Sequence, residues 1–297
     1  MTIEKELSGI QKNVLLKNYT TFKIGGKTNY FYIAKSKKEL IFAVKMAKKF
    51  RLSFFILGKG SKLLVSDEGF KGLVIKLEKV NCKLENEKIY AEAGVSLNRL
   101  VKMATENNLT GLEWAAGIPG TVGGAIRGNA GAFGSSIKDI VEKVEVYDVR
   151  NDKVKILKNK DCQFGYREST FKKNPHLIIL SSQFHLKGGD KKKITEKIKE
   201  NLNYRKQRQP LEFPSAGSVF KNPPGDSAGE LIEKCGLRGK QIGKIKISEK
   251  HANFIINLGN GRAGDVKKLI ELIKKEVKKK FAIELEEEIQ YLGFENP

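Results

Sequence analysis

The chain has 297 residues and carries 56 lysines and arginines against 34 aspartates and glutamates, a net charge of +22. This length allows two domains, or one large domain with insertions, around a substantial core. Cys82, Cys162 and Cys235 lie far apart without a CxxC or Cys/His cluster, which argues against structural zinc and a disulfide framework and fits a reducing cytosol. The polar N-terminus and the short apolar runs predict a soluble cytoplasmic protein without a membrane partner.

The positive charge suits nucleic acid, anionic lipid or anionic small molecules, and it equally suits an ordinary lysine-rich surface. Lysine is spread along the whole chain, and no dense set of aromatic residues is interleaved with it. We therefore expect no nucleic-acid partner, and a basic nucleic-acid-binding protein is kept as the alternative from another functional class.

The first half of the sequence alternates helix and strand patterns. Ser36 and Glu39 form a capping-box pattern before a helix with apolar residues on one face, and Ser96 is expected to cap a second helix that runs to about Asn108. Short strands are predicted at residues 53–57, 63–65, 73–77, 89–93, 144–149, 154–157 and 177–186. This pattern indicates an α+β fold with a mixed sheet.

Residues 117–134 are unusually rich in glycine but also contain Ile118, Val122, Ile126 and Phe133. A flexible linker carries fewer residues of this buried type. We expect a packed loop whose backbone closely approaches another group.

Further helices and strands are predicted in the last third. A helix carrying Ile194 and Ile198 runs to about Arg205 after the Gly-Gly pair at residues 188–189, near which we expect a domain boundary. A short helix after Asp226, a strand at residues 253–258, a long helix with an apolar face from Val266 to Val277 and a final strand at residues 283–292 complete the chain.

Ser218 lies in a Gly-Ser turn that is followed by Lys221 and Asn222. The turn lacks the Gly-x-Ser-x-Gly pattern of a hydrolase elbow. A serine beside a cation can give up a proton or hold a phosphate, whereas a surface turn rich in Gly, Asn and Pro is the simpler interpretation.

Residues 259–264 match GxGxxG between a predicted strand and a helix, the local context of a dinucleotide fingerprint. Asp265 in the first turn would satisfy free N–H groups and repel a pyrophosphate. Too little chain follows for the rest of a doubly wound domain. We therefore interpret the motif as a turn and helix cap.

Two other glycine segments are better candidates for a nucleotide site. Residues 57–65 place a short loop between two strands, where backbone amides can form an anion nest, and residues 117–134 supply a second loop. Two such loops closing on one diphosphate describe a flavin site of non-Rossmann type.

Seven ordered motifs resemble the UDP-N-acetylenolpyruvoylglucosamine reductase family. They cover residues 19–26, 57–65, 117–134, 162–169, 214–223, 251–257 and 285–290. The resemblance implies an α+β fold with a two-subdomain FAD-binding domain of the vanillyl-alcohol-oxidase type and a C-terminal α+β substrate domain. We assign residues 1–78 and 79–190 to the two subdomains and residues 191–297 to the substrate domain. The spacing leaves no room for the tyrosine-loop insertion of the longer family form.

The resemblance also implies the reaction. NADPH reduces non-covalently bound FAD, and hydride then passes to the enolpyruvyl methylene carbon of UDP-N-acetylglucosamine enolpyruvate, a step of peptidoglycan precursor synthesis. Arg167 and Glu288 align with residues that stabilise the resulting enolate-like charge, and Ser218 aligns with the proton donor. Glu288 helps only if it is protonated or shares a proton. Lys221 is expected to stabilise the serine alkoxide.

The same alignment supplies the binding residues. Substrate binding is expected at Arg208, Lys221 and Asn222, with Arg205 as a nearby candidate. FAD binding is expected at Gly58, Lys59, Gly60, Ser61, Gly117, Thr121, Gly123, Gly124, Asn129 and Gly131. No metal and no obligatory protein partner are expected.

Some alternatives stay open. Arg167 can pair with Glu168 or Asp161, and Glu288 is one of four glutamates within five residues. Glu287 stands where proline is common in the family, so Glu288 is chosen over Glu286 by register alone, because strand alternation would put both on one face. A flavin oxidase that uses oxygen is the rival enzyme.

Overall fold

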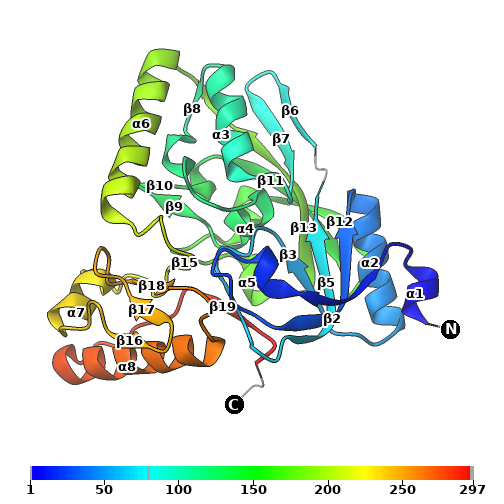
Figure 1. The fold of residues 1–297 in the computed structure, drawn as a ribbon. Helices are drawn as coiled ribbons and strands as arrows, with labels where there is room; N and C mark the ends of the chain where they lie inside the picture. Colours follow the sequence, from blue (N-terminus) through cyan, green and yellow to red (C-terminus); the bar gives the residue numbers. More distant parts are fainter. Residues whose placement is uncertain (1, 79–80, 295–297) are drawn as a thin grey trace. The chain divides into compact units, whose positions relative to one another are not determined.

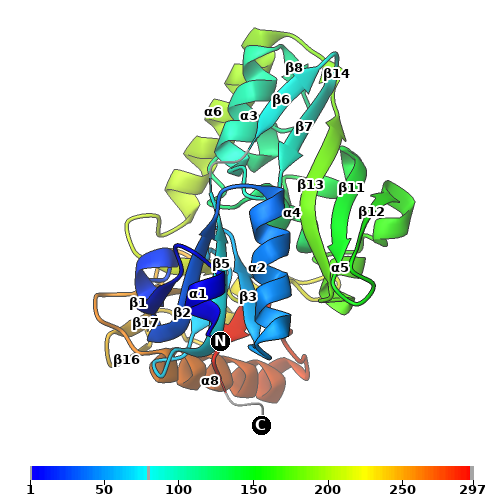
Figure 2. The ribbon, with the colours of Figure 1, turned by 90° about the vertical axis from the view of Figure 1, so that its right-hand side faces the viewer.

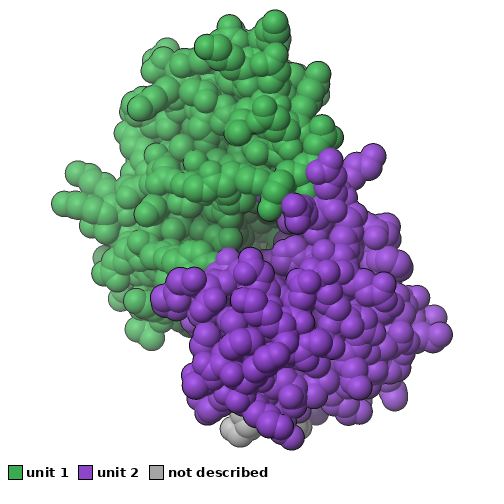
Figure 3. Space-filling view, turned by 90° about the vertical axis from the view of Figure 1, so that its left-hand side faces the viewer, with its two compact units in different colours: residues 1–10, 32–58, 74–204 green, residues 11–31, 59–73, 205–297 purple. Residues whose placement is uncertain are grey.

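The computed structural model describes residues 2–78 and 81–294. The chain divides into two compact units (Figure 3). Unit 1 contains residues 1–10, 32–58 and 74–204, and unit 2 contains residues 11–31, 59–73 and 205–297. The three-part division predicted from the sequence stays a prediction.

Unit 1 is built on an antiparallel five-stranded sheet with the order β12-β11-β13-β7-β6 (Figure 2). The strands are β6 (Cys82–Glu85), β7 (Lys88–Glu92), β11 (Val141–Asp148), β12 (Lys153–Lys158) and β13 (Leu177–His185). Four of them were predicted, and β6 was not. Unit 1 also contains α1 (Ile3–Glu6), α2 (Lys37–Lys49), β3 (Phe54–Leu57), α3 (Leu97–Glu106), β8 (Leu109–Thr110), α4 (Val122–Arg127), β9 (Gly131–Ala132), β10 (Ser135–Ser136), α5 (Thr170–Lys173) and β14 (Lys187–Gly188).

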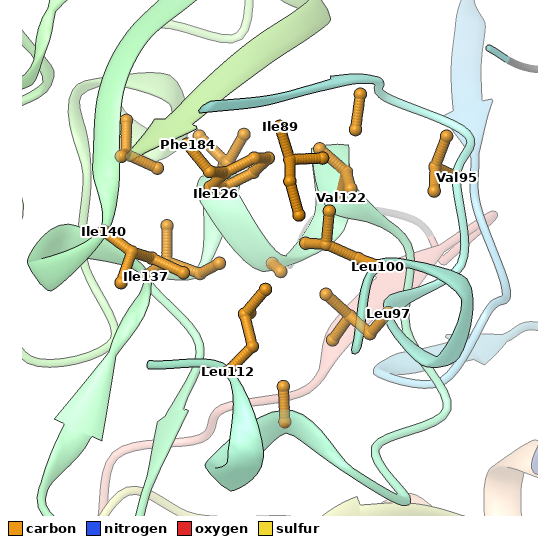
Figure 4. Close-up of a cluster of buried hydrophobic side chains, with 14 of the residues drawn as sticks. Ile89, Val95, Leu97, Leu100, Leu112, Val122, Ile126, Ile137, Ile140 and Phe184 are labelled. Carbon is orange, nitrogen blue, oxygen red and sulfur yellow. The ribbon is translucent and has the colours of Figure 1, made fainter. Parts of the chain in front are cut away.

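The two predicted helix starts of unit 1 are confirmed. The Ser36 hydroxyl accepts the N–H of Glu39 at 3.1 Å at the start of α2, and the Ser96 hydroxyl accepts the N–H of Arg99 at 3.2 Å at the start of α3. The capping box itself is only half formed, because the Glu39 carboxylate accepts the N–H of Lys35 and not that of Ser36. Leucines and isoleucines of α3 and α4 pack with Ile89 and Phe184 of the sheet in one buried cluster (Figure 4).

The glycine-rich segment is packed, as expected, but it contains the helix α4 where we predicted a loop. Thr121 begins the helix and its hydroxyl accepts the N–H of Gly124 at 3.4 Å. The N–H of Gly123 donates to the carbonyl of Ala93 at 2.8 Å, and a Cβ on Gly123 would lie 2.9 Å from the Cβ of Ala93. Glycine disfavours helices, so local propensity hides a helix whose glycines allow close packing against the end of β7.

Unit 2 contains a four-stranded sheet with the order β15-β18-β17-β16, which packs with two helices (Figure 1). Its elements are β1 (Gln11–Leu15), β4 (Leu63–Val65), β15 (Ser215–Ser218), α7 (Ala228–Lys234), β16 (Gln241–Ile242), β17 (Ile245–Ile247), β18 (Phe254–Asn257), α8 (Ala263–Phe281) and β19 (Gln290–Leu292). Three further elements run through a boundary between the units, namely β2 (Lys27–Ala34), β5 (Phe70–Leu77) and α6 (Lys191–Arg208).

The start of α8 supports the rejection of the GxGxxG motif. The N–H groups of Ala263 and Gly264 donate to the carboxylate of Asp67 at 3.0 and 3.2 Å. The first turn of the helix is therefore bound to a carboxylate of the same chain. Asp67, and not Asp265 as predicted, provides this carboxylate.

The predicted final strand at residues 283–292 is wrong for most of its length. Only Gln290–Leu292 forms a strand, which pairs in parallel with β4. Residues 283–289 have one isolated bridge, between Glu287 and Phe220. No regular strand therefore runs through both Glu286 and Glu288 in the described residues.

Gly69 offers a test of the packing of unit 2. It has φ +81°, and an added Cβ would lie 1.8 Å from the carbonyl oxygen of Lys27. We expect Gly69→Ala to lower the free energy of unfolding by more than about 3 kcal/mol, because left-handed strain adds to a backbone clash. Gly134→Ala is the matched control, since Gly134 has φ +80° with no atom within 4 Å, and should cost only about 1–2 kcal/mol. Equal denaturation midpoints for the two variants would contradict this packing.

Candidate active site

The turn that carries Ser218 is held from both sides within unit 2. Gly217 has φ +70°, and the turn is flanked by the hydroxyl of Thr21, which donates to the carbonyl of Ser215 at 2.7 Å. The side chain of Asn253 accepts the N–H of Phe220 and donates to its carbonyl, both at 2.9 Å. Two of the sequence motifs thus serve to fix the Ser218 turn.

His251 supports Asn253 in turn. Burial lowers the pKa of the His251 imidazole, and its Nδ1 accepts the N–H of Asn253 at 3.3 Å. A neutral imidazole is required for this role, because a protonated ring offers no acceptor.

The segment with the glutamates lies beside the Ser218 turn. The N–H of Lys221 donates to the carbonyl of Glu286 at 2.8 Å, and the N–H of Glu288 donates to the carbonyl of Val219 at 2.7 Å. The two carboxylates differ in environment, since the Glu286 side chain is 68% exposed and that of Glu288 only 13%. Geometry therefore separates the two residues that the sequence leaves equivalent.

Two lysines are bound to these carboxylates. Lys221 Nζ lies 2.5 Å from Glu286 Oε1, so the predicted partner of the Ser218 hydroxyl is paired with the exposed glutamate. Lys62 Nζ donates to the carbonyl oxygen of Ser218 at 2.6 Å and lies 3.1 Å from Glu288 Oε1. Sequence reasoning did not assign Lys62 a role, although the residue lies in the first glycine segment.

Arg167 lies in unit 1, and its environment is the second glycine segment. Its Nη2 donates to the carbonyl of Gly131 at 2.9 Å, and the side chain of Asn129 donates to the carbonyl of Gly165 at 2.7 Å. The hydroxyl of Ser169 donates to the carbonyl of Arg127 at 2.6 Å. The predicted arginine and the predicted FAD loop are therefore one connected structure. Burial lowers the pKa of Arg127, and the carboxylate of Glu168 opposes this effect.

The remaining predicted ligand residues have varied surroundings in unit 2. The side-chain oxygen of Asn222 accepts the N–H of Ala228 at 3.1 Å, which fixes it beside the start of α7. Arg208 is exposed at the end of α6, whereas Arg205 is buried and its pKa is lowered by burial. Lys59 is exposed, and Ser61 is half-buried.

The glycines of the predicted FAD loops have different reasons to be glycine. An added Cβ would lie 2.6 Å from Thr121 Oγ1 at Gly58, from the carbonyl of Tyr19 at Gly60 and from the carbonyl of Ser135 at Gly131. At Gly124 its nearest neighbour would be Thr121 Oγ1, at 3.5 Å. The protein itself therefore requires glycine at the first three positions, while at Gly124 there is space that another molecule can use. Gly117 has φ +78°, which favours glycine for the backbone alone.

Comparison with known proteins accounts for this arrangement. Residues 28–157 match the family model described as FAD binding domain, and residues 209–292 match the C-terminal domain of UDP-N-acetylenolpyruvoylglucosamine reductase. The α+β fold class is confirmed, and the protein is an FAD-binding oxidoreductase. The open backbone surface at Gly124 fits a bound cofactor.

Whole-chain relatives define the family more closely. The chain is 48% identical to a UDP-N-acetylenolpyruvoylglucosamine reductase of Caldanaerobacter subterraneus over 95% of this chain and 93% of the relative. It is 47% identical to that of Caldicellulosiruptor bescii over 98% of this chain and 94% of the relative. The crystal structure of the Thermus caldophilus reductase superposes with a TM-score of 0.81 at 35% identity, covering 95% of this chain and 99% of the other. The chain belongs to the UDP-N-acetylenolpyruvoylglucosamine reductase family.

Within the described residues, none of the helices combines the length and the apolar character that spanning a membrane would require.

Gly124→Val tests the second glycine loop. Outside the backbone of α4, the nearest atom to an added Cβ is Thr121 Oγ1 at 3.5 Å, so we expect a folded variant that has lost FAD. Flavin absorbance per mole of purified protein and the circular dichroism spectrum measure the two properties. Gly264→Val is the control, because that glycine also has open space but lies in α8, outside both loops. A yellow, fully loaded Gly124→Val protein would show that this loop is not at the cofactor.

Proposed function

We propose that the protein catalyses the NADPH-dependent reduction of UDP-N-acetylglucosamine enolpyruvate to UDP-N-acetylmuramate in peptidoglycan precursor synthesis. The observation that carries the proposal is the junction of the Ser218 turn with the Glu288 segment, in a chain that matches these reductases over almost its full length. We further propose that it acts in the cytoplasm, which suits its three free cysteines.

Bound FAD would supply the hydride chemistry of the reaction, by which hydride from NADPH would reach the methylene carbon of the substrate. The residues of the chain stabilise the negative charge that this transfer creates and donate the proton that it requires. Negative charge develops on the neighbouring carbon and spreads into the substrate carboxylate, where the planar guanidinium of Arg167 suits a two-point contact. The Ser218 hydroxyl then gives its proton to that carbon, which completes the addition of hydride and proton across the double bond.

The proposed binding residues form two groups, one for the UDP-sugar and one for FAD. Arg208, Lys221 and Asn222 are proposed to hold the UDP-sugar. Thr121, Asn129 and the glycines of the two loops, with Lys59 and Ser61, are proposed to hold FAD. The positive charge of the chain favours three polyanionic ligands, although most surface lysines need no such role.

Anaerobic spectroscopy of the purified holoenzyme tests the proposal. NADPH should bleach the flavin, and addition of the enolpyruvyl sugar should restore its absorbance without oxygen. Reoxidation by oxygen alone would favour the flavin oxidase, and a colourless protein that takes up no FAD would exclude both enzymes.

A further inference from the structure

Lys62 connects the two groups on which the proposed proton-transfer step depends. Its ammonium donates to the backbone carbonyl of Ser218 at 2.6 Å and lies 3.1 Å from the carboxylate of Glu288. Both contacts lie within unit 2, so they do not depend on how the two units are arranged. One side chain therefore fixes the serine turn and the glutamate together.

The backbone around Lys62 is itself fixed to the glutamate segment. The N–H of Gln290 donates to the carbonyl of Lys62 at 2.8 Å, at the start of the parallel pairing of β4 and β19. Gly217, the residue before Ser218, has φ +70°, and a Cβ on it would lie 3.7 Å from Lys62 Nζ. The position of the ammonium is thus determined by strand pairing on one side and by the turn on the other.

The charge of Lys62 matters because Glu288 is nearly buried. An ionised carboxylate in such a place opposes negative charge on a nearby substrate unless a cation compensates it. Lys221 forms its ion pair with the exposed Glu286. Lys62 places an ammonium 3.1 Å from the Glu288 carboxylate.

We propose that Lys62 is a positioning residue for the proposed reaction. It fixes the position of Glu288 relative to the Ser218 turn. It also neutralises the glutamate while negative charge develops on the substrate. This inference rests on the proposed function.

Stopped-flow measurement of both half-reactions in the anaerobic holoenzyme tests this role. Lys62→Met should slow reoxidation by the enolpyruvyl sugar about 10- to 100-fold, as is usual for residues that orient a functional ligand. Bleaching by NADPH should stay near the wild-type rate. Lys62→Arg should recover part of the loss, because it restores the charge. Lys274→Met is the matched control, since it removes a lysine that lies 2.9 Å from Glu287 in a similar ion pair, and it should leave both rates unchanged.

A double variant shows whether Lys62 acts through Glu288. Lys62→Met added to Glu288→Gln should cause a smaller further loss than Lys62→Met causes alone, because only its contact with the Ser218 carbonyl remains to be lost, whereas independent residues give multiplied losses. Multiplied losses, or wild-type reoxidation by Lys62→Met, would overturn the inference.

The denaturation midpoints of the wild type, Lys62→Met, Glu288→Gln and the double variant provide a second measurement that requires no activity. The shifts of the two single variants should not add up to the shift of the double variant. Additive shifts would show that the contact between Lys62 and Glu288 does not exist. A wild-type enzyme that the sugar fails to reoxidise would instead contradict the proposed function, and the midpoints would still test the contact.

Discussion

Ser218→Ala is expected to leave FAD content and bleaching by NADPH near normal, while reoxidation by the enolpyruvyl sugar slows about 10²–10⁴-fold, the usual contribution of a positioned acid. The hydroxyl is required only after hydride has reached the substrate, when the neighbouring carbon needs a proton. Anaerobic stopped-flow absorbance of the flavin measures the two half-reactions separately.

The Ser218→Ala substitution should remove the hydroxyl without disturbing the turn. The turn is held by contacts of Thr21 and Asn253 with the backbone of Ser215 and Phe220, and none of these bonds uses the Ser218 hydroxyl. Alanine should therefore keep the turn and the carbonyl that Lys62 contacts. Ser215→Ala is the control, because it removes a hydroxyl three residues before Ser218 that accepts the N–H of Gly217.

Three outcomes of the Ser218 experiment are informative. Ser218→Cys should recover part of the lost rate, since a thiol is a stronger acid than an alcohol but holds its proton in a different position. Equal slowing of both half-reactions would mean that Ser218 shapes a site shared by NADPH and the sugar. Unchanged reoxidation would end its role as proton donor.

Features determined by local sequence were predictable. The Ser36 and Ser96 caps depend on groups three residues apart, and the apolar faces of α2 and α3 repeat with the helical period. The strands β7, β11, β12 and β13 are likewise marked by their own apolar residues.

Features determined by partners far away in the sequence could not be predicted. The helix α4 depends on the close approach of Gly123 to Ala93, and the segment at residues 283–289 depends on its bridge to Phe220. Lys62 is separated from Ser218 by 156 positions, so no local pattern relates the two residues. Resemblance to a family supplied candidate residues, but only the fold supplied the contacts of Lys62 and the different surroundings of the two glutamates.

Glu288→Gln and Glu286→Gln form the second decisive comparison, because they make the same chemical change two residues apart. Glu288 is nearly buried against Lys62 and the Ser218 turn, whereas Glu286 is largely exposed beside Lys221. We expect Glu288→Gln to slow reoxidation by the sugar about 10²–10³-fold, because a neutral amide can neither share a proton with the developing charge nor keep the ion pair with Lys62. Glu286→Gln should change it by less than about threefold, because the Glu286 carboxylate is largely exposed to solvent, although its partner Lys221 is buried.

Binding of the sugar to the oxidised enzyme, followed by the change in the flavin spectrum, separates catalysis from affinity in both variants. Glu288→Gln should retain the spectral change with a similar dissociation constant and lose only the rate, since its contribution arises as charge develops. A loss confined to Glu286→Gln would move the role to the exposed carboxylate and make Lys221, its ion-pair partner, the lysine that matters. Equal losses in the two variants would mean that both carboxylates support the segment and that neither acts alone on the substrate.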